Sequence, residues 1–148
     1  MESIWQKEIE KPNFKSLEGN VKTNVLIIGG GMTGILCGHF LKKAGVDCVI
    51  AEAKSICDGV TKNTTAKISL HHGAIFHKMI KKYGVEKSRL YVKAHAEAVE
   101  KFRQMAENIP CDFEDKVSYV YSRSDKEKIK KEVSALKKLG VQAEFVSD

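Results

Sequence analysis

The sequence predicts an α/β chain in which a β-strand, an α-helix and a second, parallel strand come first, with additional helices and strands after them. Two observations predict this class. An apolar run at residues 25–28 enters a glycine-rich turn, Gly29-Gly30-Gly31-Met32-Thr33-Gly34. A helical pattern follows the turn and leads to a second apolar run, residues 46–51, which ends on Glu52. This order of elements is typical of a βαβ unit.

Each part of the βαβ unit has a physical role in binding a dinucleotide. Gly29 permits the tight turn from strand to helix, Gly31 lets the backbone approach a pyrophosphate, and Gly34 lets the helix lie close to the sheet. The first turn of the helix offers N–H groups and a positive dipole end to the phosphates. Glu52 would accept a hydrogen bond from a ribose hydroxyl. The unit is therefore predicted to be Rossmann-like and to bind FAD or NAD(P).

The residues after the second strand bear on which dinucleotide is bound. Residues 58–67 are a polar stretch of hydroxyl, amide and lysine side chains, where a nicotinamide-binding domain would ordinarily open another regular helix. Two interpretations stay open for this stretch. It is either a loop that wraps the phosphates and reaches toward an isoalloxazine ring, or a solvated surface loop.

Two helices are predicted next. Residues 75–83 carry apolar side chains at helical spacing, and Gly84 is expected to end that helix. A longer helix is predicted over residues 86–109, with Pro110 after it. The residues expected on its buried face are Leu90, Ala94, Ala98, Phe102, Met105 and Ile109.

The last part of the chain predicts two strands and one more helix. Alternating apolar residues predict strands at 117–122 and 141–146. Between them, Ser124 and Glu127 are expected to form a capping box that opens a helix, with Gly140 beyond its end. The residues expected to face inward on this helix are Ile129, Val133 and Leu136.

Composition excludes several function classes. The net charge of +6 is spread along the chain, and no aromatic residues interleave with the basic ones, so no nucleic-acid partner is expected. The four cysteines show no C-x-x-C spacing, which favours a reducing cytoplasm. His71, His72 and His77 lack the i, i+4 spacing of a helical metal pair, so no metal site is expected. No run is long and apolar enough to predict a membrane span.

Several short segments together resemble a known family. Trp5, Pro12 and Phe14 precede the first strand, and Thr64-Thr65-Ala66-Lys67 and His72-Gly73 follow the second. With residues 28–34 and Glu52-Ala53, they resemble the N-terminal part of the FAD-dependent oxidoreductases of the D-amino acid oxidase and glycine oxidase superfamily. The chain is most similar to the branch in which some members carry a C-terminal Rieske iron–sulfur domain. The resemblance covers nearly the whole chain.

The resemblance implies a cofactor, a reaction and a set of binding residues. FAD is the expected cofactor, and the expected reaction oxidises an amine or amino acid by hydride transfer to the flavin. Glu52 would bind the adenosine ribose, and Thr64 and Thr65 would lie along the cofactor toward the flavin. The residues expected to contact the pyrophosphate are Gly29, Gly31, Met32, Thr33 and Gly34.

Members of this family are longer than 148 residues, and later segments complete their FAD-binding domain and supply the substrate-binding sheet. The chain is therefore expected to be an incomplete, truncated FAD-binding domain without the substrate domain, and no catalytic residue can be named. Apolar surface left exposed in such a domain is expected to favour homo-oligomers. The expected divisions are an N-terminal extension at 1–22 and a partial FAD-binding domain at 23–148, which comprises a βαβ unit at 23–53, a cofactor loop at 54–73 and a helical and α/β part at 74–148.

Two alternatives from other classes stay open. One is a fragment of an NAD-dependent dehydrogenase, since NAD shares the ADP half of FAD. The other is a dinucleotide-binding module without catalysis. Flavin colour in the purified protein would separate the first alternative from the flavoprotein, and turnover of amines would separate the second.

Overall fold

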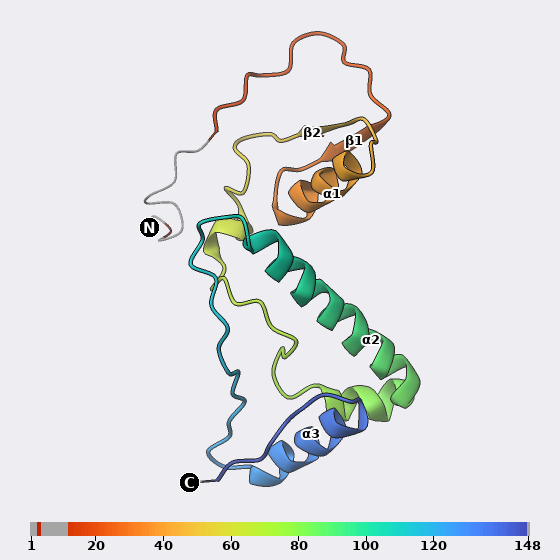
Figure 1. The fold of residues 1–148 in the computed structure, drawn as a ribbon, viewed down its shortest axis with the longest axis vertical. Coiled ribbons are helices and arrows are strands. Elements are labelled where there is room, and N and C mark those ends of the chain that lie inside the picture. The colour runs from red at the N-terminus through yellow and green to blue at the C-terminus, as the bar shows by residue number, and fades with distance from the viewer. Residues whose placement is uncertain (1–2, 4–11, 148) are drawn as a thin grey trace. The chain divides into compact units, whose positions relative to one another are not determined.

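The computed structural model describes residues 3 and 12–147, so Trp5 lies outside the described residues. The chain divides into two compact units, residues 1–67 and 68–148. The elements of the first unit are β1 (Val25–Ile28), α1 (Met32–Lys43), β2 (Cys48–Ala51) and the short 3₁₀ helix η2 (Val60–Asn63), and those of the second are α2 (Phe76–Ala106) and α3 (Lys126–Lys138) (Figure 1).

The first unit contains the predicted β–α–β arrangement. β1 and β2 pair in parallel, with Val25 opposite Cys48 and Ile28 opposite Ala51. β1 has the predicted bounds, whereas β2 begins two residues later than expected. The reason lies at the end of α1, where the Val46 amide donates to the Leu41 carbonyl at 2.9 Å and is therefore not available to the sheet.

The C-terminus of α1 ends as Gly45 predicted. Gly45 has φ +74°, a left-handed conformation that glycine adopts without strain, and its amide donates to the Lys42 carbonyl at 3.0 Å. Together with the bond from Val46 to Leu41, this is the pair of bonds of a Schellman motif. The sharp end of α1 directs the chain back into β2 beside β1.

The two faces of β1 differ in exposure. Ile27 lies on the α1 side, where its Cγ2 atom is 3.4 Å from the position that a β-carbon on Gly34 would take. Leu26 and Ile28 alternate with it and are 57% and 86% exposed. The first unit therefore has one covered sheet face and one apolar face open to solvent. In the described part of the chain this sheet has two strands, so the expectation of additional strands is wrong there.

The second unit begins with a long, kinked helix. α2 extends from Phe76 to Ala106. Within it Gly84 has φ +80° and ψ 168°, a conformation that is not helical. The predicted stop at Gly84 is thus present as a kink between two helical segments. The hydroxyl of Ser88 donates to the Gly84 carbonyl at 2.7 Å, so a side chain bonds the backbone at the kink. α2 ends three residues before the predicted Ile109.

The predicted buried face of α2 is wrong in its first half. Leu90 is 68% exposed, and Ala94 and Ala98 are exposed as well, whereas Ser88 is 0% and Val92 is 7% exposed. Ser88 can occupy the buried stripe because the Gly84 carbonyl accepts its hydroxyl proton. The buried face of α2 therefore contains the polar residue Ser88, whereas Leu90, which apolar spacing assigned to that face, is exposed.

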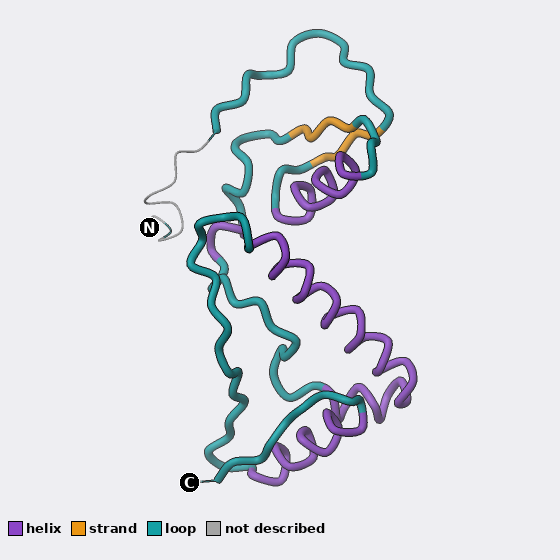
Figure 2. Tube along the Cα trace, in the orientation of Figure 1, coloured by secondary structure: helices purple, strands orange, loops and turns teal. Residues whose placement is uncertain are grey.

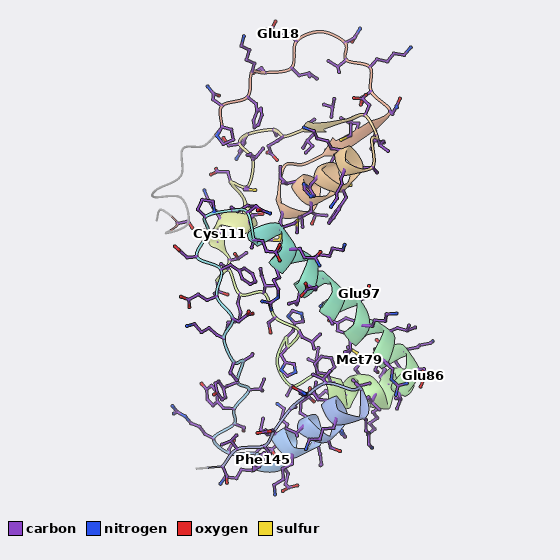
Figure 3. All side chains as sticks on the ribbon, in the orientation of Figure 1. Glu18, Met79, Glu86, Glu97, Cys111 and Phe145 are labelled. Carbon is purple, nitrogen blue, oxygen red and sulfur yellow. The ribbon has the colours of Figure 1, made fainter. Side chains whose placement is uncertain are left out.

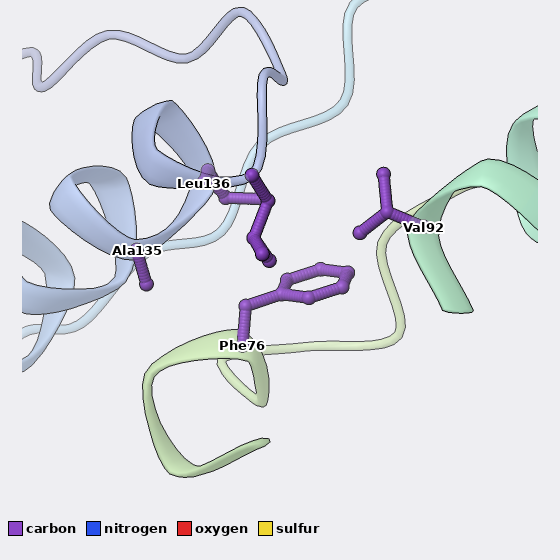
Figure 4. Packing of buried hydrophobic residues seen from close by; sticks show 5 residues of the cluster. Phe76, Val92, Ala135 and Leu136 are labelled. Carbon is purple, nitrogen blue, oxygen red and sulfur yellow. The ribbon is translucent and has the colours of Figure 1, made fainter. Parts of the chain in front are cut away.

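The core of the second unit gathers around Phe76 (Figure 4). The Phe76 side chain is 0% exposed and packs with Val92 of α2 and with residues of α3. From α3 and its end, Ala135, Leu136 and Leu139 are each at most 4% exposed. Of the predicted inward residues Leu136 is confirmed as buried, and Ile129 and Val133 are half-buried. The two helices thus share one apolar core.

A carboxylate from α3 caps the N-terminus of α2. Glu132 is only 4% exposed, and its Oε1 and Oε2 atoms accept from the amides of Phe76 at 2.6 Å and His77 at 2.9 Å. Ile75, which precedes α2, provides no side-chain cap of its own. A negative charge at a helix N-terminus is favourable, and here it also ties the two helices together.

The start of α3 differs by one residue from the predicted capping box. Asp125, not Ser124, is the N-cap, and its Oδ1 accepts from the Lys128 amide at 2.9 Å. The hydroxyl of Ser122 accepts from the Asp125 amide at 3.0 Å. The sequence offers Ser124 and Asp125 as adjacent candidates for the N-cap, and aspartate caps helices as well as serine does. Gly140, with φ +82°, ends the helix as predicted.

The strands predicted at 117–122 and 141–146 are wrong, because both segments are drawn as loop (Figure 2). Val117, Tyr119 and Tyr121 are 75–80% exposed. In the second segment Val141 and Ala143 do pack against the core around Phe76. The alternation in sequence therefore reports an extended chain, but a strand also needs the hydrogen bonds of a neighbouring strand.

The surface of α2 carries charges that pair along the helix (Figure 3). Glu86 accepts from Arg89 at 2.6 Å, and Glu97 lies 3.9 Å from Lys93. These pairs agree with a solvated helix face as the explanation of the lysine content, while the absence of a nucleic-acid partner stays a prediction. Within the described residues, no helix combines the length and the apolar character that crossing a bilayer requires.

Candidate dinucleotide-binding site

The candidate site is the turn from β1 into α1 together with the residues that follow β2. Gly29 has φ +104°, a backbone conformation that a residue with a side chain rarely adopts. Its amide donates to the Ala51 carbonyl at 2.8 Å, which continues the hydrogen bonds of the sheet by one residue. The chain then turns at Gly30 and Gly31 and enters α1 at Met32.

Gly34 and Gly38 bring α1 close to the sheet. A β-carbon on Gly34 would lie less than 3.0 Å from the carbonyl oxygen of Gly29 and 3.1 Å from its carbonyl carbon. A β-carbon on Gly38 would lie 2.8 Å from the Cδ1 atom of Ile50 in β2. The packing role expected of Gly34 is therefore confirmed. Its contact with a cofactor stays a prediction.

The first turn of α1 presents backbone donors. The N-cap residue is Gly31, which has no side chain to pair them, and the Ile35 amide is the first that donates within the helix, to Gly31 at 3.0 Å. Met32 donates to the hydroxyl oxygen of Thr61 at 3.1 Å. For Thr33 and Gly34 no acceptor is found in the part of the chain that the structure describes. Two amides at the positive end of the helix dipole thus have no acceptor among the described residues, which suits an anion.

Glu52 is held directly against the glycine turn. Its Oε2 accepts from the Gly30 amide at 2.7 Å, and its Oε1 accepts from the Lys54 amide at 3.0 Å. These bonds, that from Gly30 first, hold the pKa of the Glu52 carboxyl below its usual value. A carboxylate has about four lone-pair sites, so two amides leave room for further donors. The carboxylate is thereby tied to the residue two positions before α1.

The segment after β2 folds back over the glycine turn. The Cys57 amide donates to the Gly30 carbonyl at 2.8 Å, so Gly30 is held through both of its backbone polar groups. A β-carbon on Gly30 would also lie 3.0 Å from Ile56 and 3.1 Å from Glu52, so a larger residue would push these side chains aside. Next comes η2, whose Thr61 reaches the first amide of α1. Lys62 pairs with Asp58 at 3.0 Å.

The sequence did not single out Thr61 as a binding residue and instead predicted Thr64 and Thr65, which lie just beyond η2. Thr64 is half-buried and its hydroxyl oxygen accepts from the Ala66 amide at 3.3 Å, while Thr65 is exposed. Thr61 belongs to the same hydroxyl-rich stretch, but only the structure shows which hydroxyl lies at the helix N-terminus. The geometry therefore brings together the turn at 29–34, Glu52 and Thr61.

Comparison with known proteins identifies a family. Residues 24–148 match the DAO family, described as "FAD dependent oxidoreductase". The chain is 31% identical over 151 residues to YhfW of Bacillus subtilis (strain 168), whose name is "Putative Rieske 2Fe-2S iron-sulfur protein"; the match covers 99% of this chain and 30% of that protein. It is 26% identical over 102 residues to the gamma-glutamylputrescine oxidoreductase of Escherichia coli (strain K12), covering 68% of this chain and 24% of that protein.

The chain thus spans about a third or less of the length of these two relatives. No solved structure is significantly similar to it.

A Rieske centre needs two cysteines and two histidines. Cys37 and His39 are two residues apart, but both lie inside α1, where such residues do not face each other, and no Cys-x-x-His pair accompanies them.

Proposed function

This chain belongs to the FAD-dependent oxidoreductase (DAO) family, and on that premise we propose that its first unit binds the ADP half of FAD. One observation carries the proposal: the Glu52 carboxylate accepts from the Gly30 amide at 2.7 Å, in the turn that leads into the N-terminus of α1. In the ADP moiety a ribose with two hydroxyls is joined directly to a pyrophosphate. An acceptor next to a set of backbone donors matches that order of groups.

The residues present fit FAD in shape as well as in charge. A β-carbon on Gly31 would point to the hydroxyl of Thr61 at 3.6 Å, so the lack of side chains at 29–31 leaves the backbone open to a close approach. No acidic residue lies in the first turn of α1, where it would repel phosphates. The proposed Rossmann-like site comprises Gly29, Gly31, Met32, Thr33 and Gly34 for the pyrophosphate, Glu52 for the ribose, and Thr61, Thr64 and Thr65 along the cofactor.

Thr61 has a specific part in this proposal. Its hydroxyl oxygen accepts from the Met32 amide, so its proton is free to be donated to a second acceptor. A phosphate oxygen near the helix N-terminus would be such an acceptor. The Thr61 hydroxyl would then donate to the pyrophosphate in place of the Met32 amide, whose N–H already donates to Thr61.

FAD, when bound, supplies the acceptor for a hydride from the substrate. The protein residues described above would position the cofactor and compensate its negative charge. An amine or amino acid is the proposed substrate class, supported by the name of the Escherichia coli relative. The chain spans 30% or less of the matched relatives, so the reaction of the whole protein is part of the proposal. A cytoplasmic location and self-association also stay predictions.

The experiment is a titration of the purified 148-residue chain with FAD, NAD⁺ and ADP, read by calorimetry. We expect FAD and ADP to bind. Glu52→Gln should weaken both by about tenfold or more, because a hydrogen bond to a charged group is replaced by one to a neutral group. Thr61→Val, of similar shape, should weaken them as well. The matched control is Glu97→Gln, a 65% exposed carboxylate on α2, which should change nothing.

Each alternative has its own outcome in this experiment. Tight NAD⁺ binding with no preference for FAD would support the dehydrogenase fragment. FAD binding that leaves amines unoxidised in a longer chain with the remaining family segments would support a binding module without catalysis. If Glu52→Gln binds ADP as wild type does, the ribose assignment is wrong.

A further inference from the structure

Two histidines from separate segments of the second unit point ring nitrogens at each other. His72 lies in the loop before α2, and His95 lies on α2 itself. The Nε2 atom of His72 is 3.4 Å from the Nδ1 atom of His95. The ring centroids are 5.2 Å apart and the planes meet at 67°, so the rings are edge to face and not stacked. His72 is exposed to solvent, and His95 is half-buried.

The separation of the two nitrogens is long for a hydrogen bond. Hydrogen bonds donated by N–H groups to oxygen most often have heavy atoms about 2.9–3.0 Å apart. By contrast, two nitrogens that both bind Zn²⁺ at about 2.0–2.1 Å in tetrahedral geometry are about 3.3–3.4 Å apart. The observed 3.4 Å is long for a hydrogen bond between the two rings and matches the separation that two ligands of one tetrahedral ion would have.

The position of His95 is held by its neighbours. Its ring centroid is 4.1 Å from that of Tyr91, one turn earlier on α2, and Tyr91 in turn packs on the buried Phe76 at 6.4 Å. This contact limits the rotation of the imidazole. A ligand that is already oriented loses less side-chain entropy when an ion binds.

We propose that His72 and His95 form a binding site for a divalent transition-metal ion of the class that prefers imidazole, such as Zn²⁺. Both facing nitrogens would bind as unprotonated ligands, and each ring would keep its proton on the other nitrogen. In the described residues no third His, Cys, Asp or Glu joins the pair, so water completes the coordination. The site is open and its ion exchangeable, unlike the four-ligand sites of structural zinc.

The pair was not evident from the sequence because its members are 23 residues apart and belong to different segments. His77, which the spacing argument compared with His72, is exposed and has no place in the pair. The two histidines lie in the second unit, whereas Glu52, Thr61 and the glycine turn of the proposed ADP site lie in the first.

The test is a calorimetric titration of the full chain with ZnCl₂, with four variants. His72→Ala removes a ligand from an exposed loop, and His95→Phe removes the other while keeping a ring on Tyr91. His77→Ala controls for any exposed histidine and Cys111→Ser for an exposed thiol. We expect one Zn²⁺ per wild-type chain, affinity reduced at least tenfold in each ligand variant, and wild-type affinity in both controls.

Three results would overturn the proposal. The first is wild-type protein that binds no Zn²⁺ saturably, and the second is unchanged affinity in His72→Ala. The third is an equal loss in His77→Ala or Cys111→Ser, which would assign the ion to another site. Because His72 lies in an exposed loop, His72→Ala decides the matter even if His95→Phe fails to fold, and far-UV circular dichroism would show such a failure.

Discussion

Replacing Gly34 by alanine adds a single methyl group at the closest contact between α1 and the sheet. The added β-carbon would lie less than 3.0 Å from the Gly29 carbonyl oxygen and 3.4 Å from Ile27 Cγ2. The oxygen belongs to the backbone of the glycine turn and cannot rotate away as the end of a side chain can. Helix α1 would have to move away from the turn, and its first amides would move with it.

The magnitude follows from two opposed terms. Forcing an extra carbon into a close-packed contact costs typically 1–3 kcal/mol, and a clash with the backbone belongs at about the upper end of that range. Alanine in place of glycine within a helix returns about 1 kcal/mol. We therefore expect Gly34→Ala to lower the unfolding free energy of the first unit by about 2 kcal/mol.

Two further glycines provide a graded control. Gly38→Ala meets side-chain atoms, of which the Cδ1 methyl of Ile50 is nearest at 2.8 Å. A side-chain end can shift, so we expect a loss smaller than that of Gly34→Ala. Gly59→Ala meets nothing within 4 Å, so we expect the smallest effect of the three on residues 25–51.

Amide hydrogen exchange of residues 25–51 is the appropriate assay, because the chain has two units and a single unfolding curve would combine them. The expected order of lost protection is Gly34→Ala, then Gly38→Ala, then Gly59→Ala. If Gly34→Ala kept the protection of Gly59→Ala, the close approach of α1 to the turn would be refuted.

Two predictions concern the second unit, each read from its own unfolding free energy, measured by amide hydrogen exchange of α2 and α3. Glu132→Ala should lower its unfolding free energy by about 2 kcal/mol or more, because two amides lose their acceptor at a buried site; Glu132→Gln keeps one acceptor and should lose about half, and an equal loss in both would contradict the capping role. Burial, the larger effect, lowers the pKa of His71 from 6.5, so the folded state favours the neutral ring. Stability is then complete above the unfolded pKa and falls as the pH drops below it, and His71→Phe should flatten this dependence between about pH 7 and pH 5; an unchanged slope would reject it.

The first unit was largely predictable because its determinants are local in sequence. The bounds of β1, the turn at Gly29 and the end of α1 at Gly45 each depend on residues within one or two turns of the chain. A left-handed glycine and a four-residue apolar run determine the local backbone whatever the later part of the chain does. The position of Glu52 at the end of β2 follows from the same local order, whereas its bond to the Gly30 amide needed coordinates.

The second unit was predicted less well because its structure depends on contacts between distant segments. The carboxylate of Glu132 reaches an amide 56 residues away, and His72 meets a histidine 23 residues away. No periodicity reports either pairing. The predicted buried face of α2 failed for a related reason, because the kink at Gly84 provides a partner for Ser88 that apolar spacing does not reveal.

The strand predicted at 117–122 is absent from the structure, although its sequence has the alternation of a strand. Its alternation of Val117, Tyr119 and Tyr121 describes one face of an extended chain, and these side chains are 75–80% exposed. An extended segment becomes a strand only when another strand pairs its amides and carbonyls. The same holds for β1, whose Leu26 and Ile28 leave an apolar sheet face exposed. Both apolar faces therefore follow from one cause: alternation is encoded locally, but the surface that covers it is not.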